Sequence, residues 1–194
     1  MKKIILDLCG GTGSWSRPYA EAGYDVRLVT LPEQDVLTYN PPASVHGILA
    51  APPCTMFSIA RTTAKTPRDT REGMQTVEAC LRIIWECQHW HRLAWWSLEN
   101  PSTGLLRHFL GKPAHIFQPF QYGDAHSKRT ALWGVFTIPQ MAQLRLSFAD
   151  AGMMMRKARH STRRLAPSGL GLTCSDRRAI TPPGFARAFF ESNP

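Results

Sequence analysis

Short apolar runs alternate with amphipathic and polar segments along this chain, a pattern typical of strands that alternate with helices. The apolar runs predict strands at 4–8, 25–31, 45–51, 95–98 and 131–136, with shorter extended pieces in QDVLTY (34–39) and at 115–117. Three segments predict helices, namely 16–22, 72–92 and 105–110. The alternation predicts an α/β fold in which a mainly parallel sheet is covered by helices on both faces.

Three polar clusters follow the first, third and fourth of the main predicted strands. They are GGTG (10–13), PPCT (52–55) and ENP (99–101). Parallel strands gather their carboxyl ends at one edge of the sheet, where ligands bind in folds of this class, so we expect the three clusters to meet there. A glycine-rich turn between a strand and a helix lets a ligand approach the backbone, although such turns also occur without a ligand.

Tryptophan is concentrated in the longest predicted helix and the strand that follows it. Core packing is favoured over base stacking for these side chains, because they fall on an amphipathic helix and a buried strand. They are Trp85, Trp90, Trp95 and Trp96. Trp15, just after the glycine-rich turn, is the one tryptophan for which we expect a ligand contact.

Length and composition point to one soluble globular domain. The chain has 194 residues, of which 43% are hydrophobic and 19% charged. No apolar run approaches the roughly 20 residues that span a bilayer. The apolar stretch in MKKIILDLCGG is broken by Asp7 and does not fit a secretory signal, so we expect a cytoplasmic protein with no membrane partner.

The net charge of +9 is concentrated at the C-terminal end of the chain. Residues 1–124 hold 12 Lys and Arg against 11 Asp and Glu, a net +1, whereas residues 125–194 hold 11 against 3, a net +8. Such a basic region attracts polyanions, of which nucleic acid is the commonest, and the alternative is a solubilising surface.

The cysteines and histidines indicate no disulfide framework and no metal site. Five cysteines are an odd number, and none forms a CxxC pair. His89 and His91 are two residues apart on a predicted helix, which turns them to different faces. We therefore expect reduced thiols.

The segments DLCGGTG, APPCTMFS, ENP and SKRTALWG resemble, in this order, the motifs of the cytosine-5 DNA methyltransferases. SDRRAITPPGFARAFF is similar to the arginine-plus-TP segment of that family, and the likeness is greatest to the short members encoded by phages and prophages. The resemblance covers most of the chain. It implies a Rossmann-like fold of the class I S-adenosylmethionine-dependent methyltransferases, methylation of DNA cytosine at carbon 5, and a cytoplasmic location, in the host if a phage encodes the protein.

The resemblance also implies three catalytic residues. Carbon 5 of cytosine is a poor nucleophile, so a thiolate must first add to carbon 6, and Cys54 is expected to supply it. Glu99 is expected to donate a proton to ring nitrogen 3, and Arg129 to orient the substrate. Considered alone, Cys54 could be a core thiol, Glu99 a helix cap, and Arg129 a phosphate contact.

By the same resemblance, S-adenosylmethionine is held by the glycine-rich turn, an acidic residue for the adenine amino group and the loop before the nucleophile. These cofactor residues are Asp7, Cys9, Gly10, Gly11, Thr12, Gly13, Asp35 and Pro53. Cys9 stands where the family has phenylalanine. The acid that usually holds the ribose is missing, with Thr30 at about that place and Glu33 as a possible substitute.

The family's target-recognition domain has only a short counterpart. We expect a catalytic, cofactor-binding core at 1–136, a basic insert at 137–174 and a segment returning to the core at 175–194. The residues expected to bind nucleic acid are Lys128, Arg156, Lys157, Arg159, Arg163, Arg164, Arg177 and Arg178. So small an insert predicts weak or very short sequence preference. The family's closing GNxVP segment has at most a remnant in ESNP (191–194).

Two other functions remain open from the sequence. One is a methyltransferase acting on RNA or a free nucleotide, and the other is a non-catalytic nucleic-acid-binding relative. Single-stranded DNA would avoid the cost of flipping a base out of a duplex, a few kcal/mol.

Overall fold

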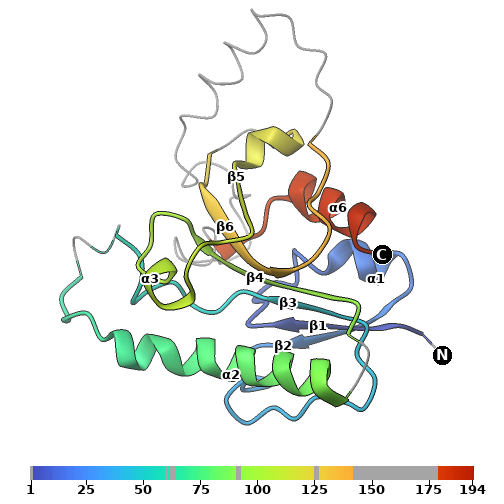
Figure 1. Cartoon of the computed structure of the whole chain (residues 1–194), viewed down its shortest axis with the longest axis horizontal. Coiled ribbons are helices and arrows are strands. Elements are labelled where there is room, and N and C mark those ends of the chain that lie inside the picture. The colour runs from blue at the N-terminus through green and yellow to red at the C-terminus, as the bar shows by residue number, and fades with distance from the viewer. Residues whose placement is uncertain (1, 60, 62–63, 91–92, 125–126, 142–178) are drawn as a thin grey trace, which may run out of the picture.

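The computed structural model describes residues 2–59, 61, 64–90, 93–124, 127–141 and 179–194 (Figure 1). Six strands form one sheet in the order β2-β1-β3-β4-β6-β5. The strands are β1 (Ile4–Leu8), β2 (Asp25–Val29), β3 (Gly47–Ala50), β4 (Trp95–Pro101), β5 (His115–Phe117) and β6 (Thr130–Val135). β2, β1, β3 and β4 are parallel, and β6 runs antiparallel to both of its neighbours, so the sheet is mixed but mostly parallel.

Helices cover both faces of the sheet, as the sequence predicts. They are α1 (Arg17–Glu21), α2 (Thr70–Trp90), α3 (Arg107–Leu110), α6 (Pro183–Ser192) and a 3-10 helix, η1 (Pro119–Tyr122). α2 lies along one face, and α1 and α6 lie on the other (Figure 1). The α/β class and the mainly parallel sheet are therefore confirmed.

Alternate residues of the strands face the two layers. Leu6 and Leu8 of β1 pack with α2, together with Ile83 and other buried residues of that helix. Ile5, just before Leu6, faces the other layer and packs with Tyr19 of α1 and with α6. Both faces of the central strands are thus buried, which explains their nearly continuous apolar sequences.

An aromatic cluster fastens α6, which the sequence analysis did not predict, to the sheet. The Phe185 ring stacks on Phe117 of β5 with 3.8 Å between ring centroids, and the Phe189 ring meets Trp15 edge-on at 5.4 Å. Trp15 is only 2% exposed. The expected ligand contact of Trp15 is therefore wrong, because α6 encloses this side chain in the core.

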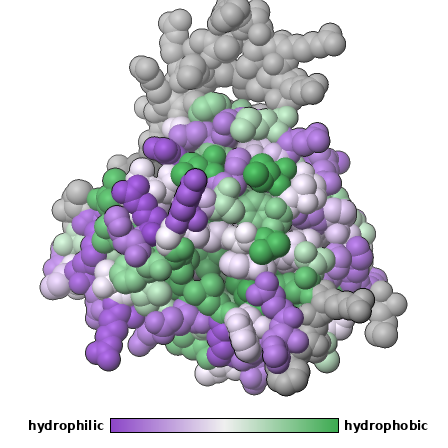
Figure 2. Space-filling model, in the orientation of Figure 1, coloured by the Kyte–Doolittle hydropathy of each residue, from purple (hydrophilic) through white to green (hydrophobic). Residues whose placement is uncertain are grey.

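The tryptophans of the helix and strand differ in burial. Trp95 is in the core, as predicted, and Trp96 is partly buried against it. Trp85, by contrast, is 62% exposed and stacks on His89. It is one of several large hydrophobic side chains at the surface, and Figure 2 shows hydrophobic residues among hydrophilic ones on the face it displays.

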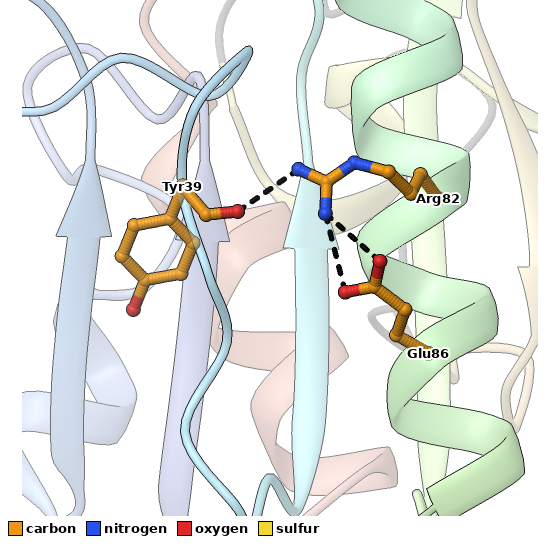
Figure 3. Close-up of polar contacts among 3 residues, drawn as sticks. All are labelled: Tyr39, Arg82 and Glu86. Carbon is orange, nitrogen blue, oxygen red and sulfur yellow. Dashed lines mark hydrogen bonds and ion pairs between the residues drawn. The ribbon is translucent and has the colours of Figure 1, made fainter.

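The segment between β2 and β3 is pinned to α2 instead of forming the extended piece predicted in QDVLTY. Turns occupy 31–33 and 36–38. The Arg82 guanidinium of α2 donates to the Tyr39 carbonyl at 2.9 Å and is held by Glu86, one helical turn along, at 2.9 Å (Figure 3). This contact ties the segment that carries Asp35 to the layer formed by α2.

Phe185→Ala should lower the free energy of unfolding by about 3–5 kcal/mol, because it removes a fully buried ring from the aromatic cluster. Urea unfolding followed by tryptophan fluorescence measures the change. Phe109→Ala is the matched control, since the Phe109 side chain is 49% exposed and should cost much less. Equal losses in the two variants would mean that α6 does not anchor the core.

Candidate functional site

The strand order reverses between β1 and β3, and in open α/β sheets such a reversal marks a crevice outside the carboxyl ends of the strands. The carboxyl edge at β1 and β3 is called the crevice below. From β1 the chain passes to β2 on one side, and it then returns to β3 on the other side. The backbone N–H of Cys9 donates to the Val29 carbonyl at 2.8 Å, and that of Ala51 donates to Leu8 at 2.9 Å. The turn after β1 and the loop after β3 therefore start side by side, at the position where open α/β sheets bind ligands.

The glycine-rich turn after β1 is tightly wound. Cys9, Gly11 and Gly13 have positive φ angles of 56°, 56° and 66°. A Cβ atom on Gly10 would lie 2.4 Å from the Asp7 carboxylate, so any larger residue would collide with that side chain. A Cβ on Gly11 would meet nothing within 4 Å, which leaves space beside the turn.

Asp7 is a fully buried carboxylate beneath this turn. Its Oδ2 accepts a hydrogen bond of 2.6 Å from the Ser16 hydroxyl, whereas Oδ1 has no hydrogen-bond partner among the residues that the structure describes. Burial raises the pKa of Asp7 to about 6, against the opposing effect of Ser16. A buried acceptor of this kind suits a ligand that brings its own donor.

Cys54 begins the turn that follows β3. Its carbonyl accepts hydrogen bonds from the backbone N–H groups of Phe57 at 2.9 Å and Ser58 at 2.8 Å, and its side chain is partly exposed. The Arg68 guanidinium donates to the carbonyls of Met56 and Ser58, which holds the same turn from the outside. Cys54 is therefore not sealed in the interior.

Asn100 connects the Cys54 loop to β4. It is fully buried, and its side-chain Nδ2 donates to the Pro52 carbonyl at 3.0 Å. β4 extends beyond its pairing with β3, which ends at Ala50 and Leu98, so the Glu99 position projects past the end of β3. The PPC and ENP segments are joined directly, as the expected meeting of the clusters requires.

Lys128, and not Arg129, lies against Glu99. The Lys128 Nζ is 3.4 Å from Glu99 Oε1, and the two side chains are only 19% and 16% exposed. The Arg129 side chain is exposed, and its carbonyl accepts a hydrogen bond of 3.0 Å from the Ser102 backbone. Lys128, predicted among the nucleic-acid contacts, thus also pairs with Glu99, a contact that the sequence did not predict.

Asp35 lies near the glycine-rich turn. Its Oδ1 accepts from the Leu37 backbone N–H at 2.9 Å, and its charge acts on the Cys9 thiol together with that of Asp7. Pro53 and Thr12 are exposed at the same edge. Asp35, Pro53 and Thr12 remain predicted cofactor residues.

The ESNP segment lies at the opposite edge of the sheet. Asn193 is buried, its Nδ2 donates to the Thr137 carbonyl at 2.9 Å, and its own carbonyl accepts from the Tyr19 hydroxyl. Thr137 follows the antiparallel strand β6, whose end is at the amino edge, and Figure 1 shows the two termini together there. ESNP is therefore not a wall of the crevice. The TP segment does reach the crevice, because the Thr181 N–H donates to the Ser14 hydroxyl at 2.9 Å.

Most of the predicted nucleic-acid residues lie outside the described part of the chain. They are Arg156, Lys157, Arg159, Arg163, Arg164, Arg177 and Arg178. Within the described part, no helix is long and apolar enough to cross a membrane. Nor do the described residues include a group of three or more His, Cys, Asp or Glu side chains placed to hold a metal ion.

Comparison with known proteins does not assign the chain to a family. No protein-family model matches the sequence, and no curated protein matches it.

The raised pKa of Asp7 predicts a pH dependence of stability. Between about pH 4 and pH 6 the unfolded chain has lost the Asp7 proton while the folded chain keeps it, so stability falls as pH rises through this range. The rise from 3.8 to about 6 corresponds to roughly 3 kcal/mol. Asp7→Asn, which resembles the protonated carboxyl group, should remove that loss.

Urea unfolding at a series of pH values measures this effect, with Asp25→Asn as the control. Asp25 is 40% exposed in its ion pair with Arg27, and its replacement should leave the slope between pH 4 and pH 6 as in the parent protein. An unchanged slope in Asp7→Asn would show that the Asp7 proton is not linked to folding.

Proposed function

We propose that this protein is an S-adenosylmethionine-dependent cytosine-5 DNA methyltransferase with a Rossmann-like fold of class I. The hydrogen bond from Asn100 to Pro52 is the observation that carries the proposal. It joins a loop with a partly exposed thiol to a strand end with a carboxylate, beside a glycine-rich turn. Thiolate addition to a pyrimidine needs this combination of groups.

S-adenosylmethionine, when bound, supplies the methyl group, and the residues around the turn after β1 suit it. Among the described residues, Asp7 Oδ1 has no hydrogen-bond partner, and the space beside Gly11 is open. A ligand that brings a hydrogen-bond donor would therefore find both an acceptor and enough space at this turn. Asp35, held near Cys9 through the contact of its segment with α2, would accept from the adenine amino group. Glu33, exposed on the turn after β2, stays the possible substitute for the ribose-binding acid.

In the proposed reaction the Cys54 thiolate forms a bond to carbon 6 of cytosine. The electron pair of the ring double bond moves toward nitrogen 3, which takes up a proton from the Glu99 side. Lys128, within 3.4 Å of Glu99, adds a positive charge where negative charge develops on the ring. After methylation, loss of the carbon 5 proton and departure of the thiolate restore the aromatic ring.

The substrate class follows from charge and from the small insert. Arg129 is exposed beside the crevice, and the C-terminal 70 residues carry most of the net charge. Phosphate contacts would therefore supply most of the affinity for DNA, with little base reading. Duplex and single-stranded DNA are both suitable, and RNA is the alternative of the same chemistry.

One observation favours a second candidate, a non-catalytic nucleic-acid-binding protein. Glu99 forms an ion pair with Lys128, so a proton donor must be made available for turnover. If it is not, the crevice would bind a nucleotide without reacting.

DNA containing 5-fluorocytosine tests the proposed reaction, because fluorine at carbon 5 prevents the final elimination. Incubation with S-adenosylmethionine should give a covalent protein–DNA complex, seen by mass spectrometry, with the adduct on Cys54. Cys54→Ala should give none, whereas Cys87→Ala, which alters a buried thiol of α2, should react as the parent does. Absence of the complex with duplex DNA, single-stranded DNA and RNA would refute the proposed activity.

Substitutions of Lys128 and Arg129 should have different effects in the same assay. Lys128→Met should slow covalent complex formation by about 100-fold at saturating DNA, since it removes a charge that acts on the transition state. Arg129→Met should weaken DNA binding, more at low than at high salt, and leave the saturated rate near that of the parent. A slower saturated rate in Arg129→Met and weaker binding in Lys128→Met would mean that Arg129, and not Lys128, acts on the cytosine ring.

A further inference from the structure

The Arg68 guanidinium binds the backbone of the turn that carries Cys54 (residues 54–58, the Cys54 turn). It donates to the carbonyls of Met56 and Ser58, the second at 3.0 Å. A guanidinium offers several N–H groups in one plane, so one side chain can hold two carbonyls at a fixed spacing. Arg68 lies two residues before α2, and this contact therefore ties the Cys54 turn to the start of that helix.

Gly73, near the start of α2, lets the helix approach the Cys54 turn closely. Gly73 is buried, and a Cβ atom at this position would lie 2.7 Å from the Met56 Cβ and 3.1 Å from the Phe57 ring. The first distance is shorter than packed carbon atoms allow, and the Met56 Cβ cannot move without its backbone. Any side chain at position 73 would therefore push the Cys54 turn away from α2, although alanine is a better helix former than glycine.

The segment after β4 holds the turn as well. The Leu105 backbone N–H donates to the Phe57 carbonyl at 2.9 Å, and the Phe57 ring is fully buried in the layer formed with α2. At the start of the loop, Asn100 holds the Pro52 carbonyl. The backbone is thus fixed on both sides of Cys54, whose side chain stays partly exposed.

We infer that Arg68 and Gly73 are positioning residues for the Cys54 thiol. They keep the Cys54 turn in one place against α2, so the thiol is placed at the carboxyl edge before a substrate arrives. Placement of reacting groups before the reaction lowers its barrier, and a shift of about 1 Å can slow a reaction about 100-fold. The placement of the turn stands on these contacts alone, whereas its effect on a reaction rests on the proposed function.

Hydrogen–deuterium exchange of the full-length protein tests the placement without any substrate. The Phe57 and Ser58 backbone N–H groups donate to the Cys54 carbonyl, so their exchange reports opening of the turn. Arg68→Lys keeps the charge but offers one ammonium group in place of the planar guanidinium. Exchange of the two amides should therefore become at least about tenfold faster in this variant. Unchanged exchange would overturn the role of Arg68.

Arg61→Lys is the matched control. The Arg61 guanidinium also binds two carbonyls, those of Thr66 and Pro67, at 2.7 and 3.1 Å. Neither carbonyl belongs to the Cys54 turn, so exchange of the two reporting amides should stay close to that of the parent. Equally fast exchange in Arg61→Lys and Arg68→Lys would mean that Arg68 has no specific role, and would overturn the inference.

Covalent complex formation with 5-fluorocytosine DNA tests the effect on the reaction. Gly73→Ala should slow this step about 100-fold at saturating DNA, while DNA binding stays near that of the parent. Met56→Gly removes the Cβ that the new methyl group would meet, so the double variant should react as fast as Met56→Gly alone. Such a rescue is not expected if Gly73→Ala merely impairs folding. A parent-like rate in Gly73→Ala, or a double variant about 100-fold slower than Met56→Gly, would overturn the role of Gly73.

The two experiments separate this inference from the proposed function. Faster exchange of the Phe57 and Ser58 amides is also expected in Gly73→Ala, because the displaced turn loses its support from α2. If the parent forms no covalent complex with duplex DNA, single-stranded DNA or RNA, the proposed function fails. The exchange rates still decide in that case whether Arg68 and Gly73 hold the Cys54 turn.

Discussion

The reversal of strand order between β1 and β3 is the constraint on which the carboxyl edge depends. Because β2 and β3 lie on opposite sides of β1, the turn after β1 and the loop after β3 border one crevice. Two side-chain contacts between distant segments then complete it: Asn100 holds Pro52, and Ser14 holds Thr181. Segments separated by up to 167 residues are thus assembled around the end of one strand.

This edge is less favourable for stability than the layers on either side of it. The layers are filled with aliphatic and aromatic side chains, whereas the edge buries the Asp7 carboxylate with only one oxygen satisfied among the described residues. It also holds Cys9 at a positive φ angle that L residues seldom adopt. Proteins retain such local costs mainly at functional sites, where a bound partner compensates for them.

The strands and the long helix were predictable because their signals are local. Central strands buried on both faces need unbroken apolar runs, and α2 needs an apolar stripe at helical spacing. The extended piece predicted in QDVLTY was wrong because Asp35 accepts a hydrogen bond from the Leu37 backbone N–H. Such a side-chain hydrogen bond favours a turn over an extended strand. α6 was missed although its local signals are present, a proline in its first turn and the buried Phe185 and Phe189 four residues apart. Only its packing on Phe117 of β5 depends on the three-dimensional arrangement.

For the site, the sequence predicted which segments meet but not which neighbouring side chain points inward. Lys128 and Arg129 are adjacent cations, and only the path of the chain before β6 decides that Lys128 reaches Glu99. The order of motifs along the chain predicts which loops form the site, whereas only the three-dimensional structure shows which side chains in those loops contact each other.

Those pairs constrain what can bind in the crevice. Asp7 Oδ1 needs a donor, while the Lys128 ammonium offers donors and lies in a mostly buried position. A ligand that fills the edge must therefore carry a hydrogen-bond donor for the turn after β1 and an acceptor for the end of β4. One ligand with both groups could span the edge, and so could two ligands that bind side by side. A transfer between bound molecules requires the second arrangement, because the reacting groups must lie next to each other.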